Sequence, residues 1–223
     1  MTLRIEIVSD VICPWCFVAK RRLVKALQLL GTQFEAQVTW LPFQLNPDMP
    51  KRGMDRKVYR SAKFGSWEKS QALDAHVAAV GATEGIDFAF DRINSTPNTF
   101  DAHRLIWFAQ QEGGQDALVE ALFHGYFIEG RDIGEHQVLA EIAGALGMDA
   151  QKALRFLNSG EGAVEVRAEE ERTRHMGISS VPSFLVNCHL ATSGALLPQH
   201  LAAALHAVLQ SPQDQCSLRD RAC

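Results

Sequence analysis

The sequence lacks any hydrophobic run long enough to cross a membrane, which takes about 20 apolar residues. Its first residues, MTLRIE, lead directly into a predicted strand. They show neither the charged and apolar regions nor the small-residue cleavage site of a secretory signal. We therefore expect a cytoplasmic protein with no membrane partner.

The chain also lacks a large excess of charge of either sign. It carries 22 Lys and Arg against 26 Asp and Glu, a formal net charge of −4. A nucleic-acid partner is not expected, because such proteins usually have a strongly basic surface. The 223 residues, 47% of them hydrophobic, are ordinary for a globular protein and suffice for one domain with a large insertion. We expect a monomer or a homodimer.

Cysteine is scarce and odd in number, which argues against a closed framework of structural disulfides. In the cytoplasm most thiols are reduced, and a disulfide is more often catalytic or regulatory than structural. The chain's five cysteines are Cys13, Cys16, Cys188, Cys216 and Cys223.

The first two cysteines form a Cys-Pro-Trp-Cys motif between two regular elements. Apolar residues alternate along residues 3–8 as in a buried or half-buried strand. A helical pattern follows the motif and ends at Gly31. Cys13 should therefore lie where the strand ends and the helix starts, with Pro14 at the first helical position. A helix N-terminus stabilises negative charge, so we expect a lowered pKa for Cys13. Cys16, one turn further, should be buried, which makes Cys13 the nucleophile and Cys16 the resolving thiol.

Two other interpretations of this motif compete with redox chemistry. Cys-x-x-Cys is also half of a common zinc site. Cysteine is also an ordinary small core residue, although two at this strand-to-helix spacing are rarely accidental. A βαβ context favours the redox interpretation.

The rest of the chain alternates between strand signals at its ends and helices in its middle. A second strand is predicted within residues 33–45, and Pro42 indicates a sheet edge or the strand's end. Strand signals return at 183–186 and 190–192, before a final helix at 199–209. In between, the pattern predicts helices over residues 67–80, 100–111, 116–128, 135–146, 149–157 and 161–176.

Without the helical block, the order of elements is strand, Cys-x-x-Cys helix, strand, then strand, strand, helix. The first helix supplies the crossover that a parallel strand pair needs. This order predicts the α/β class, with a thioredoxin-like fold (βαβ…ββα) and a large all-helical insertion. The predicted thioredoxin-like parts are residues 1–45 and 176–210, the insertion is 46–175, and 211–223 is a flexible tail.

Three separated motifs, in order along the chain, resemble one known family. Cys-Pro-Trp-Cys after the first strand, a large helical insert and a Val-Pro before a late strand resemble the DsbA-type thioredoxin superfamily. The segments NTFDAHR at 98–104 and GISSVPSF at 177–184 are similar to its FrnE-like cytoplasmic branch, which is related to 2-hydroxychromene-2-carboxylate isomerase-like proteins. The resemblance covers about residues 3–210.

The resemblance implies a protein thiol–disulfide oxidoreductase or isomerase, which we expect to act in oxidative-stress defence. Carried over by position, Cys13 is the nucleophile, Cys16 the resolving thiol and Pro182 a cis-proline facing the pair. A cis X–Pro bond is usually a deliberate feature of a tight turn. The backbone of the preceding Val181 can then bind an extended substrate strand.

Further expectations concern substrate contacts and partners. We assign substrate binding to Pro14, Trp15 and Val181, and to His103 on a helix that faces the active site in the family. No histidine lies between the two thiols, unlike the Pro-His of strongly oxidising DsbA proteins, so we expect a less oxidising potential. No metal and no tightly bound cofactor are expected. The redox group is the Cys13–Cys16 disulfide, with glutathione or thioredoxin as electron partner and protein or small thiols and disulfides as substrates.

Several candidate residues keep a second, structural interpretation. His103 could equally be a partly buried histidine with one satisfied hydrogen bond. Asp10 could tune the thiols or move a proton, or it could cap the loop. The basic cluster on the first helix is either a solvated face or a surface that attracts glutathione or an acidic partner, and comprises Lys20, Arg21, Arg22 and Lys25.

The remaining thiols suggest a second redox element. Cys188 lies in a predicted turn, and Cys216 and Cys223 lie in the polar tail, where disulfide exchange would be easy. They form either a regulatory disulfide, or an exchange partner for Cys13 and Cys16, or incidental free thiols.

Two other functions stay open. Relatives on this fold act as glutathione-dependent isomerases or transferases of aromatic small molecules, but they typically carry Ser in place of Cys13. A thiol metal-binding protein would add Cys188, His189 or the tail thiols to Cys13 and Cys16, at an irregular ligand spacing.

Overall fold

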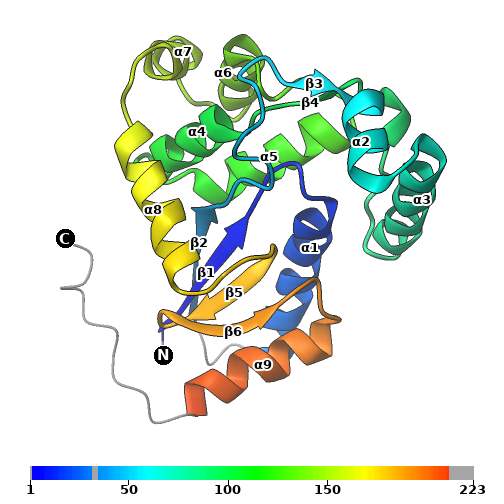
Figure 1. The fold of residues 1–223 in the computed structure, drawn as a ribbon. Helices are drawn as coiled ribbons and strands as arrows, with labels where there is room; N and C mark the ends of the chain where they lie inside the picture. Colours follow the sequence, from blue (N-terminus) through cyan, green and yellow to red (C-terminus); the bar gives the residue numbers. More distant parts are fainter. Residues whose placement is uncertain (1, 32–34, 211–223) are drawn as a thin grey trace.

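A mixed sheet lies at the centre of the computed structural model, which describes residues 2–31 and 35–210 (Figure 1). The strands follow the order β2–β1–β5–β6. β1 pairs in parallel with β2 and antiparallel with β5, which forms an antiparallel hairpin with β6. The strands span Thr2–Ser9 (β1), Glu35–Pro42 (β2), Ser183–Val186 (β5) and His189–Ser193 (β6). The predicted thioredoxin-like fold is confirmed, and β2 is an edge strand, as Pro42 indicated.

Helices fill the chain between β2 and β5 and flank the sheet. The helix α1 supplies the crossover between the parallel strands β1 and β2, and α9 ends the described chain. Among the described residues, no helix is both long and apolar enough to span the bilayer. The helices are α1 (Pro14–Leu30), α2 (Arg56–Phe64), α3 (Trp67–Thr83), η1 (Phe90–Arg92, a 3₁₀ turn), α4 (Phe100–Gln111), α5 (Gln115–Phe127), α6 (His136–Ala145), α7 (Ala150–Asn158), α8 (Ala163–His175) and α9 (Pro198–Gln210).

Helix α2 and a two-residue strand pair in the insertion were not predicted from the sequence. The pair joins β3 (Met54–Asp55) to β4 (Ser95–Thr96), and strands this short leave no alternating pattern. Helix α2 is mostly polar, and its Val58 is 61% exposed, so no apolar stripe marks it. Its start is nevertheless local: the side chain of Asp55 accepts a hydrogen bond from the Val58 N–H and caps the helix.

The sheet separates two hydrophobic clusters. Alternate β1 residues, Leu3, Ile5 and Ile7, belong to the large cluster that includes α1, α4, α5 and α9. Val8 and Leu185 belong to a smaller cluster with residues of β2 and of the segment after α8. Helix α1 packs against α9, and α8 contacts β2 (Figure 1). Strand β1 is therefore buried on both sides, and the residues that follow it are held within the core.

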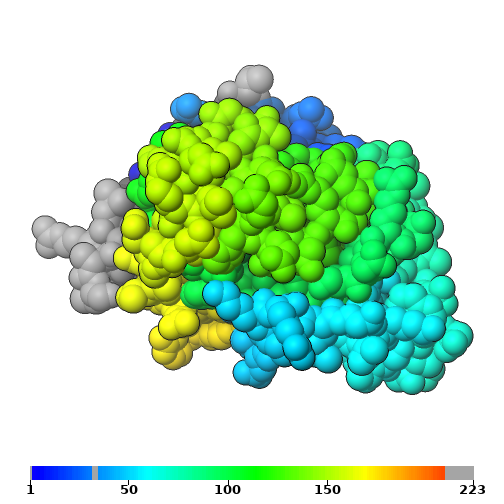
Figure 2. Space-filling view, turned by 90° about the horizontal axis from the view of Figure 1, so that it is seen from above, coloured from blue at the N-terminus to red at the C-terminus, as the bar shows by residue number. Residues whose placement is uncertain are grey.

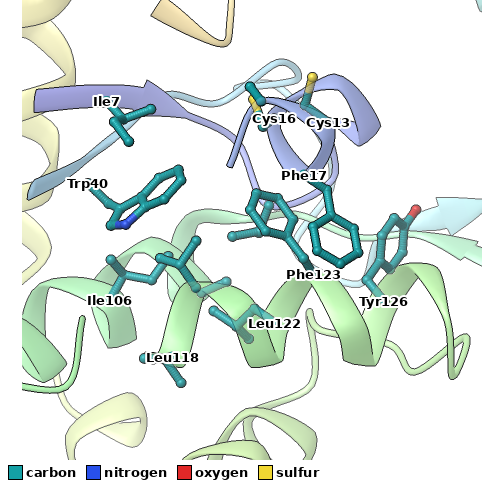
Figure 3. Close-up of a cluster of buried hydrophobic side chains, with 14 of the residues drawn as sticks. Ile7, Cys13, Cys16, Phe17, Trp40, Ile106, Leu118, Leu122, Phe123 and Tyr126 are labelled. Carbon is teal, nitrogen blue, oxygen red and sulfur yellow. The ribbon is translucent and has the colours of Figure 1, made fainter. Parts of the chain in front are cut away.

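Aromatic side chains dominate the large cluster below the Cys-Pro-Trp-Cys motif (Figure 3). Phe17, one residue after Cys16, stacks on Phe123 of α5 with ring centroids 5.1 Å apart. Phe127 extends the stack from the same helix. Each buried aromatic ring contributes about 1.5–3 kcal/mol relative to exposure. These contacts join α1, which carries the motif, to the helical insertion.

The basic cluster of α1 is only partly a solvated face, since Arg21 is half-buried and Lys25 exposed. Lys20 and Arg22 are buried, each only 7% exposed. Their acidic partners lie far away in the sequence and were therefore hidden from a local pattern. The ion pairs join Lys20 to Asp116 (2.7 Å), Arg21 to Glu120, Arg22 to Glu84 (2.6 Å) and Lys25 to Glu84 (2.7 Å).

These ion pairs and the aromatic stack fasten the insertion to α1 along its length. Glu84 and its neighbours follow α3, whereas Asp116 and Glu120 lie on α5. Seen from above, the insertion forms a nearly continuous cover over this end of the molecule (Figure 2). The motif at the start of α1 is thus held between the sheet and the insertion.

Candidate active site

The Cys-Pro-Trp-Cys motif forms the first turn of α1. Cys13 is the N-cap residue in an extended conformation, and Pro14 occupies the start of the helix, as predicted. The N–H of Cys13 donates to the Asp10 carbonyl (3.0 Å), and the N–H of Cys16 donates to the Cys13 carbonyl (3.0 Å). Both cysteines are free thiols. This turn brings the two thiols together while giving them different surroundings.

Both cysteines are buried, but Cys13 keeps slight access to solvent and Cys16 has none. The sulfur of Cys13 points away from the hydrophobic cluster (Figure 3), and its residue is 6% exposed, whereas Cys16 is 0% exposed. Burial raises the pKa of the Cys16 thiol well above its ordinary value, and the neighbouring Cys13 raises it further. The Ser9 hydroxyl and the Asp10 backbone N–H act in the opposite direction on that pKa. Cys16 therefore stays protonated unless a base assists it.

The loop before β5 brings a cis peptide bond close to Cys13. The Val181–Pro182 peptide bond is cis, as predicted. The Cys13 Sγ lies 3.8 Å from the Val181 carbonyl oxygen, its hydrogen-bond acceptor. The Pro182 carbonyl accepts a hydrogen bond from the Gly194 N–H (2.7 Å), which ties this loop to the end of β6. We call Cys13, Trp15, Val181 and Pro182 the outer thiol site.

Trp15 completes the outer thiol site, together with a residue that the sequence did not reveal. Pro14 and Trp15 are half-buried, and the Trp15 ring lies 5.8 Å from the ring of His76 between centroids. His76 is exposed and belongs to α3 in the insertion. No local signal could have identified it, because α3 meets the motif only in the folded chain.

A separate group of polar residues begins with Ser9 and Asp10, which interact with Cys16, and continues to His103. Asp10 is 0% exposed, and its carboxylate accepts hydrogen bonds from the Leu45 N–H (2.8 Å) and the Ile12 N–H (3.5 Å). His103 of α4 is 4% exposed, and its Nε2 lies 3.5 Å from Asp10 Oδ1. The structure thus places His103 beside Asp10 rather than with Trp15 and Val181. We call Cys16, Ser9, Asp10 and His103 the inner thiol site.

A cleft of about 920 Å³ leads to the inner thiol site from the β2 edge of the sheet. Ser9, Val11 and His103 form part of its wall. Gln110, Gln111 and Glu165 line it where α4 and α8 are exposed. Ser9 and the cleft were missed by sequence reasoning, since a serine at the end of a strand carries no distinctive pattern.

Arg104, the neighbour of His103, has a structural role. The residue is 3% exposed, and its guanidinium donates hydrogen bonds to the carbonyls of Leu157 (3.1 Å) and Phe156 (3.1 Å) at the end of α7. It also pairs with Asp101 (2.7 Å). Arg104 therefore adds donors to the carbonyl groups at the C-terminus of α7.

Of the other cysteines, Cys188 lies on the wall of the cleft. Cys188 lies with Asn187 in the β5–β6 turn, both with positive φ, and it is disulfide-bonded. Cys216 and Cys223 lie outside the described residues. Within residues 2–31 and 35–210, no cluster of three or more His, Cys, Asp or Glu side chains is arranged to hold a metal ion.

Comparison with known proteins agrees with this geometry. The family model of the DSBA-like thioredoxin domain matches residues 4–206. A probable DsbA oxidoreductase from Streptomyces coelicolor shares 31% identity at a TM-score of 0.86, over 95% of this chain and 93% of that one.

Two more distant structures share the fold. A 2-hydroxychromene-2-carboxylate isomerase gives a TM-score of 0.70 at 15% identity, over 93% of this chain and 96% of its own. The cytosolic disulfide reductase DsbM from Pseudomonas aeruginosa, solved with glutathione, gives a TM-score of 0.64 at 18% identity, over 94% of this chain and 100% of its own. From the family model, the Streptomyces relative and the paired thiols at the start of α1, the chain belongs to the DsbA-like thioredoxin family of thiol–disulfide oxidoreductases.

Proposed function

We propose that this protein is a protein thiol–disulfide oxidoreductase that works by dithiol–disulfide exchange between Cys13 and Cys16. The observation that carries the proposal is the pairing of two free thiols with different access, Cys13 at the helix N-terminus and Cys16 beneath it. The N-terminus of α1 stabilises negative charge where a Cys13 thiolate attacks. Cys16 lies one helical turn away, as a resolving thiol must.

In the reducing direction, two thiol exchanges follow one another. The Cys13 thiolate attacks a substrate disulfide, forming a mixed disulfide and releasing one substrate thiolate, which takes up a proton. The Cys16 thiolate then attacks Cys13, so that the Cys13–Cys16 disulfide forms and the second substrate thiolate leaves. The substrate gains two electrons and the enzyme pair loses two. The reverse sequence oxidises a substrate dithiol.

Substrates would bind across the outer thiol site. The backbone of Val181 is suited to pair with an extended peptide, and half-buried Pro14 and Trp15 offer an apolar contact beside Cys13. We propose glutathione or thioredoxin as electron partner, since the DsbM structure of the same fold was solved with glutathione. A cytoplasmic location and a role in oxidative-stress defence, as in the FrnE-like branch, belong to the same proposal.

The decisive experiment is the reduction potential of the Cys13–Cys16 pair. The protein is equilibrated in glutathione buffers of graded ratio, and thiol content is read by alkylation and mass spectrometry. We expect one two-electron transition in the peptides that carry Cys13 and Cys16, absent in Cys13→Ser and unchanged in Cys188→Ser. Its value against the cytosolic glutathione poise gives the resting direction of electron flow. A pair that shows no transition over the accessible range contradicts the proposal.

A glutathione-dependent isomerase of aromatic small molecules is the second candidate. The likeness to 2-hydroxychromene-2-carboxylate isomerase concerns the fold alone. Two free thiols in one helical turn favour the redox function, because isomerisation transfers no electrons and needs no resolving thiol. Isomerase turnover that persists in Cys16→Ser would favour this second function.

A further inference from the structure

The inner thiol site poses a chemical problem for the resolving step. Cys16 must lose a proton before it can attack the mixed disulfide at Cys13. It is 0% exposed, and its burial disfavours the thiolate. Direct transfer of the proton to bulk water is therefore obstructed on the side of the outer thiol site.

Two buried polar atoms of the inner thiol site lack a conventional hydrogen-bond partner. They are Ser9 Oγ and His103 Nε2, on residues 4% exposed each. Leaving buried polar groups unpaired costs about 1–3 kcal/mol each, so such groups call for a functional explanation. The Ser9 hydroxyl interacts with the Cys16 thiol, and His103 Nε2 faces the Asp10 carboxylate at 3.5 Å.

The geometry of Asp10 suits it to hold a histidine rather than to react. Its two carboxylate oxygens are fixed by the backbone N–H groups of Leu45 and Ile12, and its carbonyl accepts from Cys13. The carboxylate is thus held in one orientation beside His103. A fixed carboxylate stabilises the charge that an imidazole acquires when it takes up a proton.

The cleft supplies the route between these groups and solvent. Ser9 and His103 both line it, and its volume of about 920 Å³ accommodates water molecules. It opens on the β2 edge, away from Trp15 and Val181, so a proton can leave while substrate covers the outer thiol site.

We propose that His103, oriented by Asp10, accepts the proton of Cys16 through the Ser9 hydroxyl during the resolving step. His103 then releases this proton to solvent through the cleft. This inference rests on the proposed function. In the balanced step, the Cys16 S–H proton passes to Ser9 Oγ while the Ser9 proton passes toward His103, directly or over water. The Cys16 sulfur then bonds to Cys13 Sγ and displaces the substrate thiolate. Ser9 contacts the reacting thiol, whereas His103 and Asp10 act through it.

Other titratable groups lie near the inner thiol site and can also contribute to the pH dependence of the resolving step. Tyr126 of α5 interacts electrostatically with Asp10, and burial raises the Tyr126 pKa far above neutrality, so it does not titrate in the working range. The remaining groups are Cys13 beside Cys16, Glu6 of β1, and Glu165, Glu169 and Arg172 of α8 along the cleft.

The test separates the two exchange steps in His103→Gln. Attack by Cys13 is measured in a Cys16→Ser background, where the mixed disulfide with oxidised glutathione accumulates. Resolution is measured in the protein with both thiols, by rapid acid quench and mass spectrometry. We expect unchanged attack and a resolution rate lowered about 100-fold at pH 7, the scale of a lost general base. The deficit should shrink as pH rises, because solvent base replaces His103.

The matched control is His136→Gln. His136 also pairs with an aspartate, Asp101 at 2.8 Å, but it lies on α6 away from the thiols. Both steps should keep wild-type rates in this control. If His103→Gln does not fold, as judged by circular dichroism, Ser9→Ala tests the same step with the loss of one oxygen atom.

The outcomes of this experiment are distinguishable. Resolution in folded His103→Gln, or in Ser9→Ala if it replaces that variant, at the wild-type rate and pH profile overturns the inference and leaves the exchange function intact. A Cys16→Ser protein that forms no mixed disulfide at Cys13 contradicts the proposed function itself.

Discussion

The two thiol sites lie within one turn of α1 but differ in almost every physical respect. The outer thiol site joins the start of α1 to the loop before β5, with half-buried Trp15 and Val181 beside Cys13, whose thiol lies near the Val181 carbonyl. The inner thiol site is buried and polar and includes His103 of α4, with Cys16 fully buried beside Ser9 and Asp10. The difference shows how one short motif can separate substrate contact from proton handling.

The largest expected contrast comes from removing each thiol in turn. Cys16→Ser should accumulate a stable mixed disulfide through Cys13, because no resolving thiol remains. Cys13→Ser should form none, because Cys16 is inaccessible. Non-reducing mass spectrometry after incubation with oxidised glutathione reads both. Adduct formation at Cys16 in Cys13→Ser would contradict the division between the two sites.

Alkylation of the reduced wild-type protein compares the two thiols without mutation. At pH 7, iodoacetamide should label Cys13 first, and Cys16 only after unfolding, because thiolate character and access both favour Cys13. Timed digestion and peptide mapping measure the two rates. Equal labelling rates in the folded protein would show that the inner thiol site opens readily.

The buried ring of Phe123 and the half-buried ring of Trp15 should contribute differently to the free energy of unfolding. Phe123→Ala removes a fully buried ring that stacks on Phe17, and should lower the free energy of unfolding by about 3–5 kcal/mol. Trp15→Ala removes a half-buried ring of the outer thiol site and should cost about 1–2 kcal/mol while weakening peptide binding. Urea denaturation and exchange kinetics with a disulfide peptide measure the two effects. A larger stability loss for Trp15→Ala would reverse the comparison.

The smallest effect is the pH dependence of stability that Cys16 adds. Burial raises the folded pKa of Cys16, so its thiol stays protonated in the folded state while an unfolded thiol ionises above about pH 8.5. The stabilising contribution is therefore complete at neutral pH and declines as pH rises from there toward the folded pKa, by at most about 1.4 kcal/mol per pH unit. Urea midpoints of wild type and Cys16→Ala between pH 7 and 9.5 compare the slopes. Parallel curves would show that Cys16 does not carry this dependence.

The sequence was most informative where neighbouring residues decide the structure. The strand, the cap at Cys13 and the proline at the start of α1 follow from local patterns, and the helix from Phe100 to Gln111 was predicted with its exact bounds. The basic cluster was misjudged, because burial of Lys20 and Arg22 depends on acidic residues of α5 and of the segment after α3. Charge on one helix does not reveal its partners.

By itself, the sequence determined that two thiols would share the first helical turn after a buried strand, since that arrangement depends on residues within a few positions. The tertiary structure alone decided that His76 would reach Trp15, and that His103 would pair with Asp10 and line the same cleft as Ser9. Those contacts join α3 and α4 of the insertion to the motif. They depend on how the buried faces of distant helices pack, which no local pattern encodes.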